Sequence, residues 1–261
     1  MNQQQIQQCG DELYEAMVSR TTIKPLTERF DDISLDDAYH ISLRMLERRL
    51  AAGERIIGKK IGVTSKAVQN MLNVHQPDFG YLTDKMAYSQ GQEMPISEHL
   101  IQPKAEGEIA FVLKKDLLGP GLTNADVLAA TDFVIPCFEV VDSRIENWKI
   151  KIQDTIADNA SCGLFVLGDT AVDPRKIDLT TCGMVVEKNG QIISTGAGAA
   201  ALGSPVNCVT WLANTLGKFG IPLKAGEVIL SGSLVPLEPV KAGDFMTVSI
   251  GGIGSASVRF V

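Results

Sequence analysis

The chain has 261 residues, a net charge of −7, 45% hydrophobic residues and 21% charged residues. This balance is typical of a globular protein with a large core and excludes a disordered chain. The acidic charge without a basic stripe argues against a nucleic-acid partner. No run of about 18 apolar residues is present, which argues against a membrane span.

The start of the chain and its cysteines bear on location. The segment from Met1 to Gln5 is polar and lacks the basic and then apolar segments of a signal peptide. Five cysteines are scattered without a CxxC pair, a pattern that favours free, buried thiols over disulfides or a zinc site. We therefore predict a cytoplasmic protein.

Two helices are predicted first along the chain. Residues 4–20 carry apolar side chains at helical spacing. Ser34 is a favourable N-cap for a second helix, Asp37 adds negative charge to its first turn, and Gly53 ends it. These helices are expected to form a small N-terminal layer.

The rest of the chain is richer in strands. We expect a strand over residues 55–63, a short helix over 65–72, and a loop from His75 to Gly80. Ser204 and Pro205 open a helix that ends near Gly217. Further strands, bounded by turn residues and with a tight hairpin turn at Asn189-Gly190, are predicted over 105–113, 133–141, 163–167, 184–187, 191–194, 227–230, 245–250 and 256–260.

This order of elements predicts an α+β fold. A small α-rich region over residues 1–75 precedes a β-rich catalytic domain over residues 76–261, unless the two form one continuous domain.

The most informative segment runs from Ala105 to Leu113. Residues two apart on a strand face the same side, with Cα atoms roughly 7 Å apart, so Glu106 and Glu108 point together. Burying two like charges is costly unless a cation offsets them, and carboxylate oxygens suit Mg²⁺ or Mn²⁺. The alternative is an exposed edge strand with two solvated glutamates.

Glu139 is a third acidic candidate. It interrupts the apolar strand Cys137-Phe138-Glu139-Val140-Val141, where a carboxylate without a partner is unusual. Three carboxylates would leave coordination positions open for water or substrate, as in a catalytic metal site. The alternative is that Glu139 pairs with Arg144 or with a lysine.

Strand alternation separates two neighbouring lysines. Lys60 shares a face with Gly58 and Gly62, whose missing side chains leave room for a ligand, whereas Lys59 lies on the other face. Lys60 is thus the better candidate to meet an anionic substrate or donate a proton. The alternative is a pair of surface lysines on an edge strand.

Two glycine-containing segments are weaker signals. The run from Gly196 to Ala201 fits GxGxxA, but no helix follows at once and no acid lies about 20 residues further on. We interpret it as a close backbone turn and not as a dinucleotide site. Ser231-Gly232-Ser233 is either a ligand-facing loop or an ordinary turn.

The three histidines are not spaced as metal ligands.

The order of four motifs resembles the fumarylacetoacetate hydrolase superfamily, and most closely its hydratase/decarboxylase branch. The resemblance covers essentially the whole chain, and it depends on the combination of motifs because each alone is unspecific. The motifs are Gly58-Lys59-Lys60-Ile61-Gly62, Glu106-Gly107-Glu108, Phe138-Glu139-Val140-Val141-Asp142 and Asn159-Ala160-Ser161.

The resemblance implies a fold and a metal site. The fold would be the superfamily's mixed β-roll with a small helical N-terminal region. Glu106, Glu108 and Glu139 would hold Mg²⁺ or Mn²⁺. Lys60 would contact the substrate carboxylate or enol oxygen and neutralise charge or shuttle a proton.

Two further residues match pocket positions of this branch. Asp78 is expected to help position water as a catalytic residue, and Ser161 is expected to bind substrate. Hydrolase members carry a Gly-Thr-Gly turn late in the chain, where this sequence has Ser231-Gly232-Ser233. That departure favours the hydratase/decarboxylase branch over a carbon–carbon hydrolase.

The implied activity is metal-dependent hydration of 2-hydroxypenta-2,4-dienoate to 4-hydroxy-2-oxopentanoate, in meta-cleavage catabolism of aromatic compounds. One alternative is a 2-oxo-3-hexenedioate (4-oxalocrotonate) decarboxylase, and another is a non-catalytic partner subunit of that decarboxylase. The branch also implies a homo-oligomer and an association between hydratase and decarboxylase.

Overall fold

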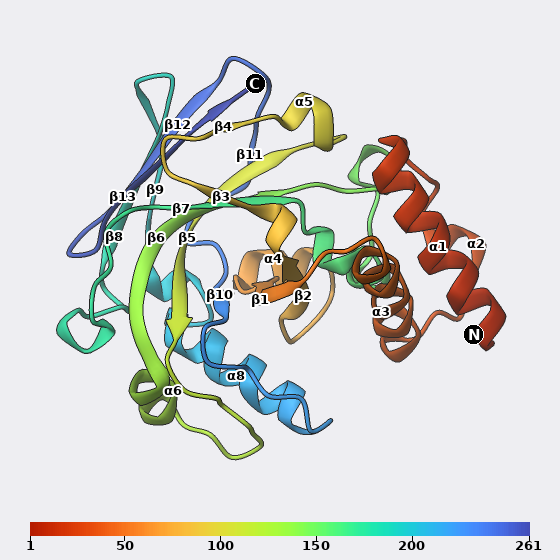
Figure 1. Ribbon diagram of the computed structural model, residues 1–261, viewed down its shortest axis with the longest axis horizontal. Coiled ribbons are helices and arrows are strands. Elements are labelled where there is room, and N and C mark those ends of the chain that lie inside the picture. The colour runs from red at the N-terminus through yellow and green to blue at the C-terminus, as the bar shows by residue number, and fades with distance from the viewer.

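The structure is a computed structural model that describes residues 1–261. Its N-terminal part is helical, with α1 (Gln3–Ser19) and α3 (Leu35–Ala51) side by side and the short α2 (Leu26–Arg29) between them in sequence (Figure 1). Ser34 caps α3 as predicted: its hydroxyl accepts from the Asp37 N–H at 3.0 Å, and the Asp37 carboxylate accepts from the Ser34 N–H at 3.0 Å.

A small hydrophobic core lies under these helices. It joins Leu13 of α1 and Ile41 of α3 to Ile152 and Ile156 of α7 (Ile152–Ala157), a helix from the middle of the chain. The N-terminal helices therefore pack on the segment that leads into Asn159–Ser161. The division of the chain at residues 75 and 76 stays a prediction.

The larger sheet has eight strands and carries the candidate site. Its order is β2-β1-β10-β5-β6-β7-β3, with β11 paired to β5. The β1–β10 and β3–β7 pairs are parallel, and the other pairs are antiparallel. The strands are β1 (Ile56–Gly62), β2 (Asp78–Thr83), β3 (Ala87–Ser89), β5 (Lys104–Leu113), β6 (Thr131–Val141), β7 (Leu164–Leu167), β10 (Val228–Leu230) and β11 (Glu238–Pro239).

The smaller sheet has five strands in the order β4-β13-β12-β8-β9. It packs closely on β5, because a Cβ atom at Gly107 would lie 2.8 Å from Met184 Sδ. The predicted hairpin turn is confirmed by Asn189 and Gly190, which both have positive φ angles, 53° and 79°. The strands are β4 (Glu93–Met94), β8 (Gly183–Lys188), β9 (Gln191–Ala197), β12 (Phe245–Ile250) and β13 (Gly254–Phe260).

The remaining helices are short, except α8 (Pro205–Gly217), and none is long and apolar enough to cross a membrane. The others are α4 (Lys66–Met71), α5 (Ile96–His99), α6 (Asn124–Ala130) and the 3₁₀ helices Asp84–Met86, Glu146–Trp148, Pro174–Lys176 and Gly198–Ala200. Residues Asn159–Ser161 form a further single turn, whose φ angles are positive. All five cysteines are free and buried, as predicted.

The α+β class with a helical N-terminal region is confirmed. The predicted loop from His75 to Gly80 is wrong over its second half, because β2 begins at Asp78 and Gly80 pairs with Lys60 of β1. The interpretation of residues 196–201 as a close backbone turn agrees with the structure, since a Cβ at Gly198 would lie 1.7 Å from the Leu179 oxygen.

Candidate metal centre

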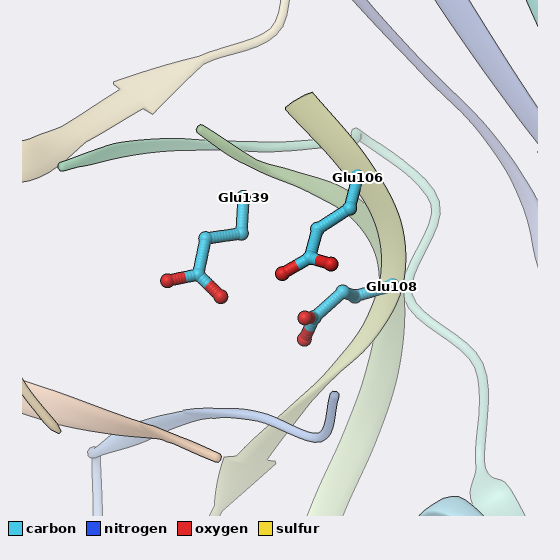
Figure 2. Close-up of side chains that lie close together, drawn as sticks. All are labelled: Glu106, Glu108 and Glu139. Carbon is cyan, nitrogen blue, oxygen red and sulfur yellow. The ribbon is translucent and has the colours of Figure 1, made fainter. Parts of the chain in front are cut away.

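Three glutamates meet on the concave face of the larger sheet. Glu106 and Glu108 lie two apart on β5, and the β5–β6 register places Glu139 opposite Glu106. One carboxylate oxygen from each lies within 4.8 Å of the others. Figure 2 shows the three carboxylates pointing toward one another. The prediction that Glu106 and Glu108 share a face is confirmed.

The surroundings leave much of this negative charge uncompensated. Glu108 and Glu139 are buried, and Glu106 is only partly exposed. Two of their buried oxygens, Glu108 Oε1 and Glu139 Oε2, have no hydrogen-bond partner, and Glu139 Oε1 has only the ion pair with Lys60 Nζ at 3.1 Å. Burial and the neighbouring charge of Glu139 raise the pKa of Glu106 to about 7, and the same causes raise the pKa of Glu108 well above its ordinary value.

This donor set fits a hard divalent cation. Carboxylate oxygens are the ligands that such cations take, and a cation would offset the cost of ionising neighbouring buried acids. A solvated edge strand, the alternative for Glu106 and Glu108, does not agree with the structure because β5 is paired on both sides, to β10 and β6.

Lys60 lies beside the glutamates. Its Nζ atom is 3.1 Å from Glu139 Oε1 and donates a hydrogen bond to the Ala160 carbonyl at 3.0 Å. Glu139 is thus both a member of the acidic cluster and the ion-pair partner of a lysine. Arg144, the other partner considered for Glu139, instead contacts Asp158 and lies 3.9 Å from Asp142.

Lys59 lies on the opposite face of β1, as alternation predicted. It is buried and not on the surface: Nζ donates to both oxygens of Glu227 at 2.8 Å. The prediction that Gly58 leaves room for a ligand is wrong, because a Cβ there would lie 1.9 Å from the Val228 oxygen of β10. Gly62 does open space on the Lys60 side, and Asp78 Oδ1 fills it, 2.3 Å from the Cβ position.

Asp78 begins β2 next to Lys60. It is buried, and neither carboxylate oxygen has a hydrogen-bond partner. Burial raises the pKa of Asp78, and the positive charge of Lys60 opposes that rise. The next residue, Phe79, stacks on Tyr39 of α3 with ring centroids 4.5 Å apart, so the N-terminal layer reaches this edge of the site.

Ser161 lies at the end of the turn Asn159–Ser161, which also supplies the Ala160 carbonyl. Its hydroxyl is 3.0 Å from that of Thr155, and the residue is buried. The structure therefore brings Lys60, Ala160 and Glu139 into direct contact. The Ser161 hydroxyl makes its hydrogen bond to α7 and not to the glutamates.

Two backbone groups also reach the acidic cluster or Lys60, and the first comes from a segment for which the sequence left open a ligand-facing loop or an ordinary turn. Gly232 N–H donates to Glu108 Oε2 at 2.8 Å, so the Ser231-Gly232-Ser233 segment faces the acidic cluster. The other group is the Ala160 carbonyl. Every residue carries such groups, so only the fold selects the ones that matter.

Comparison with known proteins agrees with this architecture. Residues 57–261 match the family described as fumarylacetoacetate (FAA) hydrolase C-terminal. A 2-hydroxypent-2,4-dienoate hydratase from Pseudomonas putida is 80% identical over 221 residues, which are 85% of this chain and 100% of that protein. A 2-hydroxyhexa-2,4-dienoate hydratase from Comamonas testosteroni is 60% identical over 260 residues, which are 99% of this chain and 98% of that protein.

Two solved structures share the fold of this chain. The 4-oxalocrotonate decarboxylase from Pseudomonas putida G7, complexed with magnesium and adipate, superposes with a TM-score of 0.96 at 38% identity, covering 100% of this chain and 99% of that chain. The fumarylpyruvate hydrolase from Pseudomonas aeruginosa shares the fold, with a TM-score of 0.62 at 12% identity over 78% of this chain and 88% of that chain. This chain belongs to the fumarylacetoacetate hydrolase family.

Proposed function

We propose that this protein is a hydro-lyase that adds water to 2-hydroxypenta-2,4-dienoate and forms 4-hydroxy-2-oxopentanoate, in the meta-cleavage catabolism of aromatic compounds. The observation that carries the activity is the identity of 80% and 60% to two dienoate hydratases, the second over nearly the whole of both chains. The decarboxylase of similar fold is more distant, at 38% identity.

The acidic cluster is the proposed metal site. Glu106, Glu108 and Glu139 would hold Mg²⁺ or Mn²⁺, a role supported by their convergence and by their unpartnered buried oxygens. When bound, such a cation supplies Lewis-acid polarisation of the substrate's 2-oxygen and a template for its carboxylate.

Lys60 is the proposed anchor for substrate charge. Its ammonium group lies at the edge of the acidic cluster, where it can pair with the substrate carboxylate or 2-oxygen. Negative charge on the 2-oxygen grows as C4 is attacked, so a fixed ammonium group at that point stabilises the transition state more than the ground state.

Asp78 is the proposed proton carrier. The enol proton moves to C5 overall, water adds its oxygen to C4, and the proton lost by water ends on C3. A carboxylate that accepts a proton from the attacking water at Oδ1 or Oδ2 and returns it to C3 satisfies this balance. Both oxygens of Asp78 are free of other hydrogen bonds, and Ser161 on the adjoining turn is the proposed substrate-binding hydroxyl.

The 4-oxalocrotonate decarboxylase activity is the second candidate because of the superposition with that enzyme. A non-catalytic partner subunit is the third. The intact set of Lys60 and three glutamates favours an active enzyme over a partner subunit, because buried charge is costly to retain without use.

An ultraviolet assay tests the proposal. Purified protein is stripped of metal and mixed with fresh 2-hydroxypenta-2,4-dienoate, with and without Mg²⁺ or Mn²⁺. We expect metal-dependent loss of the dienol absorbance, with 4-hydroxy-2-oxopentanoate as the product. Carbon dioxide release from 2-oxo-3-hexenedioate, without turnover of the dienoate, would assign the decarboxylase activity instead, and no turnover of either would favour the partner subunit.

The assembly and location are part of the same proposal. A homo-oligomer is supported by exposed apolar side chains such as Ile192 on the edge strand β9 and Phe219 after α8, which are 65% and 72% exposed. Analytical ultracentrifugation, alone and mixed with a 4-oxalocrotonate decarboxylase, measures both proposed associations. A cytoplasmic location is supported by the five free cysteines.

A further inference from the structure

Three consecutive residues beside the site adopt a left-handed backbone. Asn159, Ala160 and Ser161 have φ angles of 52°, 52° and 53°. Residues other than glycine disfavour this conformation, and it normally occurs at single positions. A run of three persists only where the surrounding structure holds it in place. We call residues 159–161 the left-handed turn.

The left-handed turn supplies a contact to Lys60. The Ala160 carbonyl accepts the hydrogen bond from Lys60 Nζ at 3.0 Å, and Glu139 Oε1 lies 3.1 Å from the same nitrogen. Relaxation of the turn to a right-handed conformation would rotate its peptide planes and move this carbonyl. Lys60 would then keep only the Glu139 contact.

Arg144 holds both ends of the left-handed turn. Its Nη2 donates to the Asp158 carbonyl at 2.7 Å, just before the turn, and its Nη1 donates to the Cys162 carbonyl at 2.9 Å, just after it. Nε donates to the Asp158 carboxylate at 2.5 Å, and that carboxylate also accepts from the Arg144 N–H at 2.9 Å. The side chain is fully buried. A planar guanidinium group can fix the distance between two carbonyls, which a lysine cannot do.

A second tether joins the left-handed turn to β2. The Asn159 side chain accepts from the Tyr81 N–H at 2.8 Å and donates to the Tyr81 carbonyl at 3.0 Å. Glycine at position 80 permits this close approach, because a Cβ there would lie 2.3 Å from the backbone oxygen of Asn159. The turn is therefore fixed to the strand that begins with Asp78.

We propose that Arg144 is a positioning residue for Lys60: its guanidinium group clamps the left-handed turn, and the turn's Ala160 carbonyl orients the Lys60 ammonium group. The expected loss of kcat/KM rests on the proposed function. The expected displacement of Lys60 rests only on the contacts described above. Arg144 itself touches neither the glutamates nor the substrate in this scheme.

The first test compares two buried arginines. Arg144→Lys keeps a positive charge beside Asp158 but removes the planar fork. Arg49→Lys is the matched control: Arg49 is buried, forks onto Glu54, and lines the same cavity of about 460 Å³ as Arg144. The measurements are the melting temperature, the Kd for Mg²⁺ by calorimetry, kcat/KM for the dienoate, and a crystal structure of each variant.

We expect Arg144→Lys to lower kcat/KM roughly 10- to 100-fold, with the Kd for Mg²⁺ changed less than about threefold. Its crystal structure should show Lys60 Nζ more than about 3.5 Å from the Ala160 oxygen. Arg49→Lys should lower the melting temperature and leave kcat/KM within about threefold. An unchanged Lys60–Ala160 contact in the Arg144→Lys crystal would overturn the inference. The crystal-structure measurement can be made even if the wild-type protein does not hydrate the dienoate. Failure of this inference can therefore be told apart from failure of the proposed function.

A second pair of variants keeps the test decisive if Arg144→Lys does not fold. Asn159→Gly and Asn159→Ala both lose the two hydrogen bonds to Tyr81, and they differ in the cost of the left-handed backbone. We expect kcat/KM to be roughly fivefold or more higher for the glycine variant than for the alanine variant. Equal values for the two variants would show that the left-handed conformation does not position Lys60.

Discussion

Lys60 Nζ lies 3.1 Å from Glu139 Oε1, although their strands are not neighbours. In the larger sheet, β10 and β5 lie between β1 and β6. Adjacent strands are about 4.8 Å apart, so a flat sheet would hold these two strands about 14 Å apart. The contact therefore depends on the rolled shape of the sheet, which brings lysine and glutamates to one interior point.

Replacing Lys60 should affect activity and stability together. Lys60→Met removes the ammonium group proposed to stabilise charge on the substrate, and we expect kcat/KM to fall at least about 100-fold. It also leaves Glu139 buried without its ion-pair partner, which should lower the free energy of unfolding of the metal-free protein by about 3 kcal/mol. Lys59→Met is the control: it should destabilise the fold through Glu227 yet leave kcat/KM within about threefold. Equal losses of activity in both variants would contradict the assignment of Lys60.

Replacing Glu106 should separate metal binding from folding. Glu106→Gln removes one proposed ligand and one of three close negative charges, so we expect the metal-free protein to melt at a higher temperature than the wild type. The variant should bind Mg²⁺ at least about 10-fold more weakly and lose kcat at least about 100-fold. Calorimetry and the dienoate assay measure the two effects. Glu187→Gln makes the same change on β8 and should alter neither the Kd for Mg²⁺ nor kcat. Full activity of Glu106→Gln in metal-free buffer would contradict the proposed metal site.

The stabilisation by metal should depend on pH. Burial raises the pKa of Glu106 from 4.5 to about 7, so between these values the unfolded chain binds fewer protons than the fold. The contribution of Glu106 to stability is therefore fully present below pH 4.5 and is lost as pH rises toward 7 in the metal-free protein. A divalent cation binds the ionised form. The rise in melting temperature on adding Mg²⁺ should thus be small near about pH 5.5 and larger near about pH 8; an equal rise at both would contradict this account.

Replacing Asp78 should affect chemistry and leave the metal in place. Asp78→Asn keeps the shape of the side chain but cannot accept the proton of the attacking water, and we expect kcat to fall roughly 100- to 10,000-fold. The Kd for Mg²⁺ should change less than about threefold, because Asp78 is not a proposed ligand. The melting temperature should not fall, since a buried carboxylate without a hydrogen-bond partner is replaced by a neutral amide. A kcat near the wild-type value would remove Asp78 from the mechanism.

The sequence predicted the long elements and the faces of the strands. Apolar periodicity and the Ser34 cap defined α1 and α3, and alternation placed Glu106 and Glu108 together. Alternation also separated Lys60 from Lys59. These are local properties of a helix or a strand, which do not depend on the rest of the fold.

The contacts between distant segments could not be predicted in this way. The register that places Glu139 opposite Glu106 depends on how the two long strands β5 and β6 are aligned. Gly80 suggested a loop, but in the fold it lets β2 approach the Asn159 oxygen. The six-residue α7 is too short for periodicity to detect. The left-handed turn is imposed by Arg144 and Tyr81, so its three residues carry no local signal.

The parallel pairing of β1 with β10 has a consequence for how the enzyme is made. Lys60 lies on an early segment of the chain, yet its strand completes its hydrogen bonding with Leu230, which a ribosome synthesises much later. Contacts between such distant segments form slowly, because a long loop must close first. The contact between Lys60 and Glu139 should thus form only after translation has passed β10, later than the pairing of β5 with β6 that brings the glutamates together. The lysine that offsets the charge of this acidic cluster should therefore join it late in synthesis, after the three glutamates have been translated.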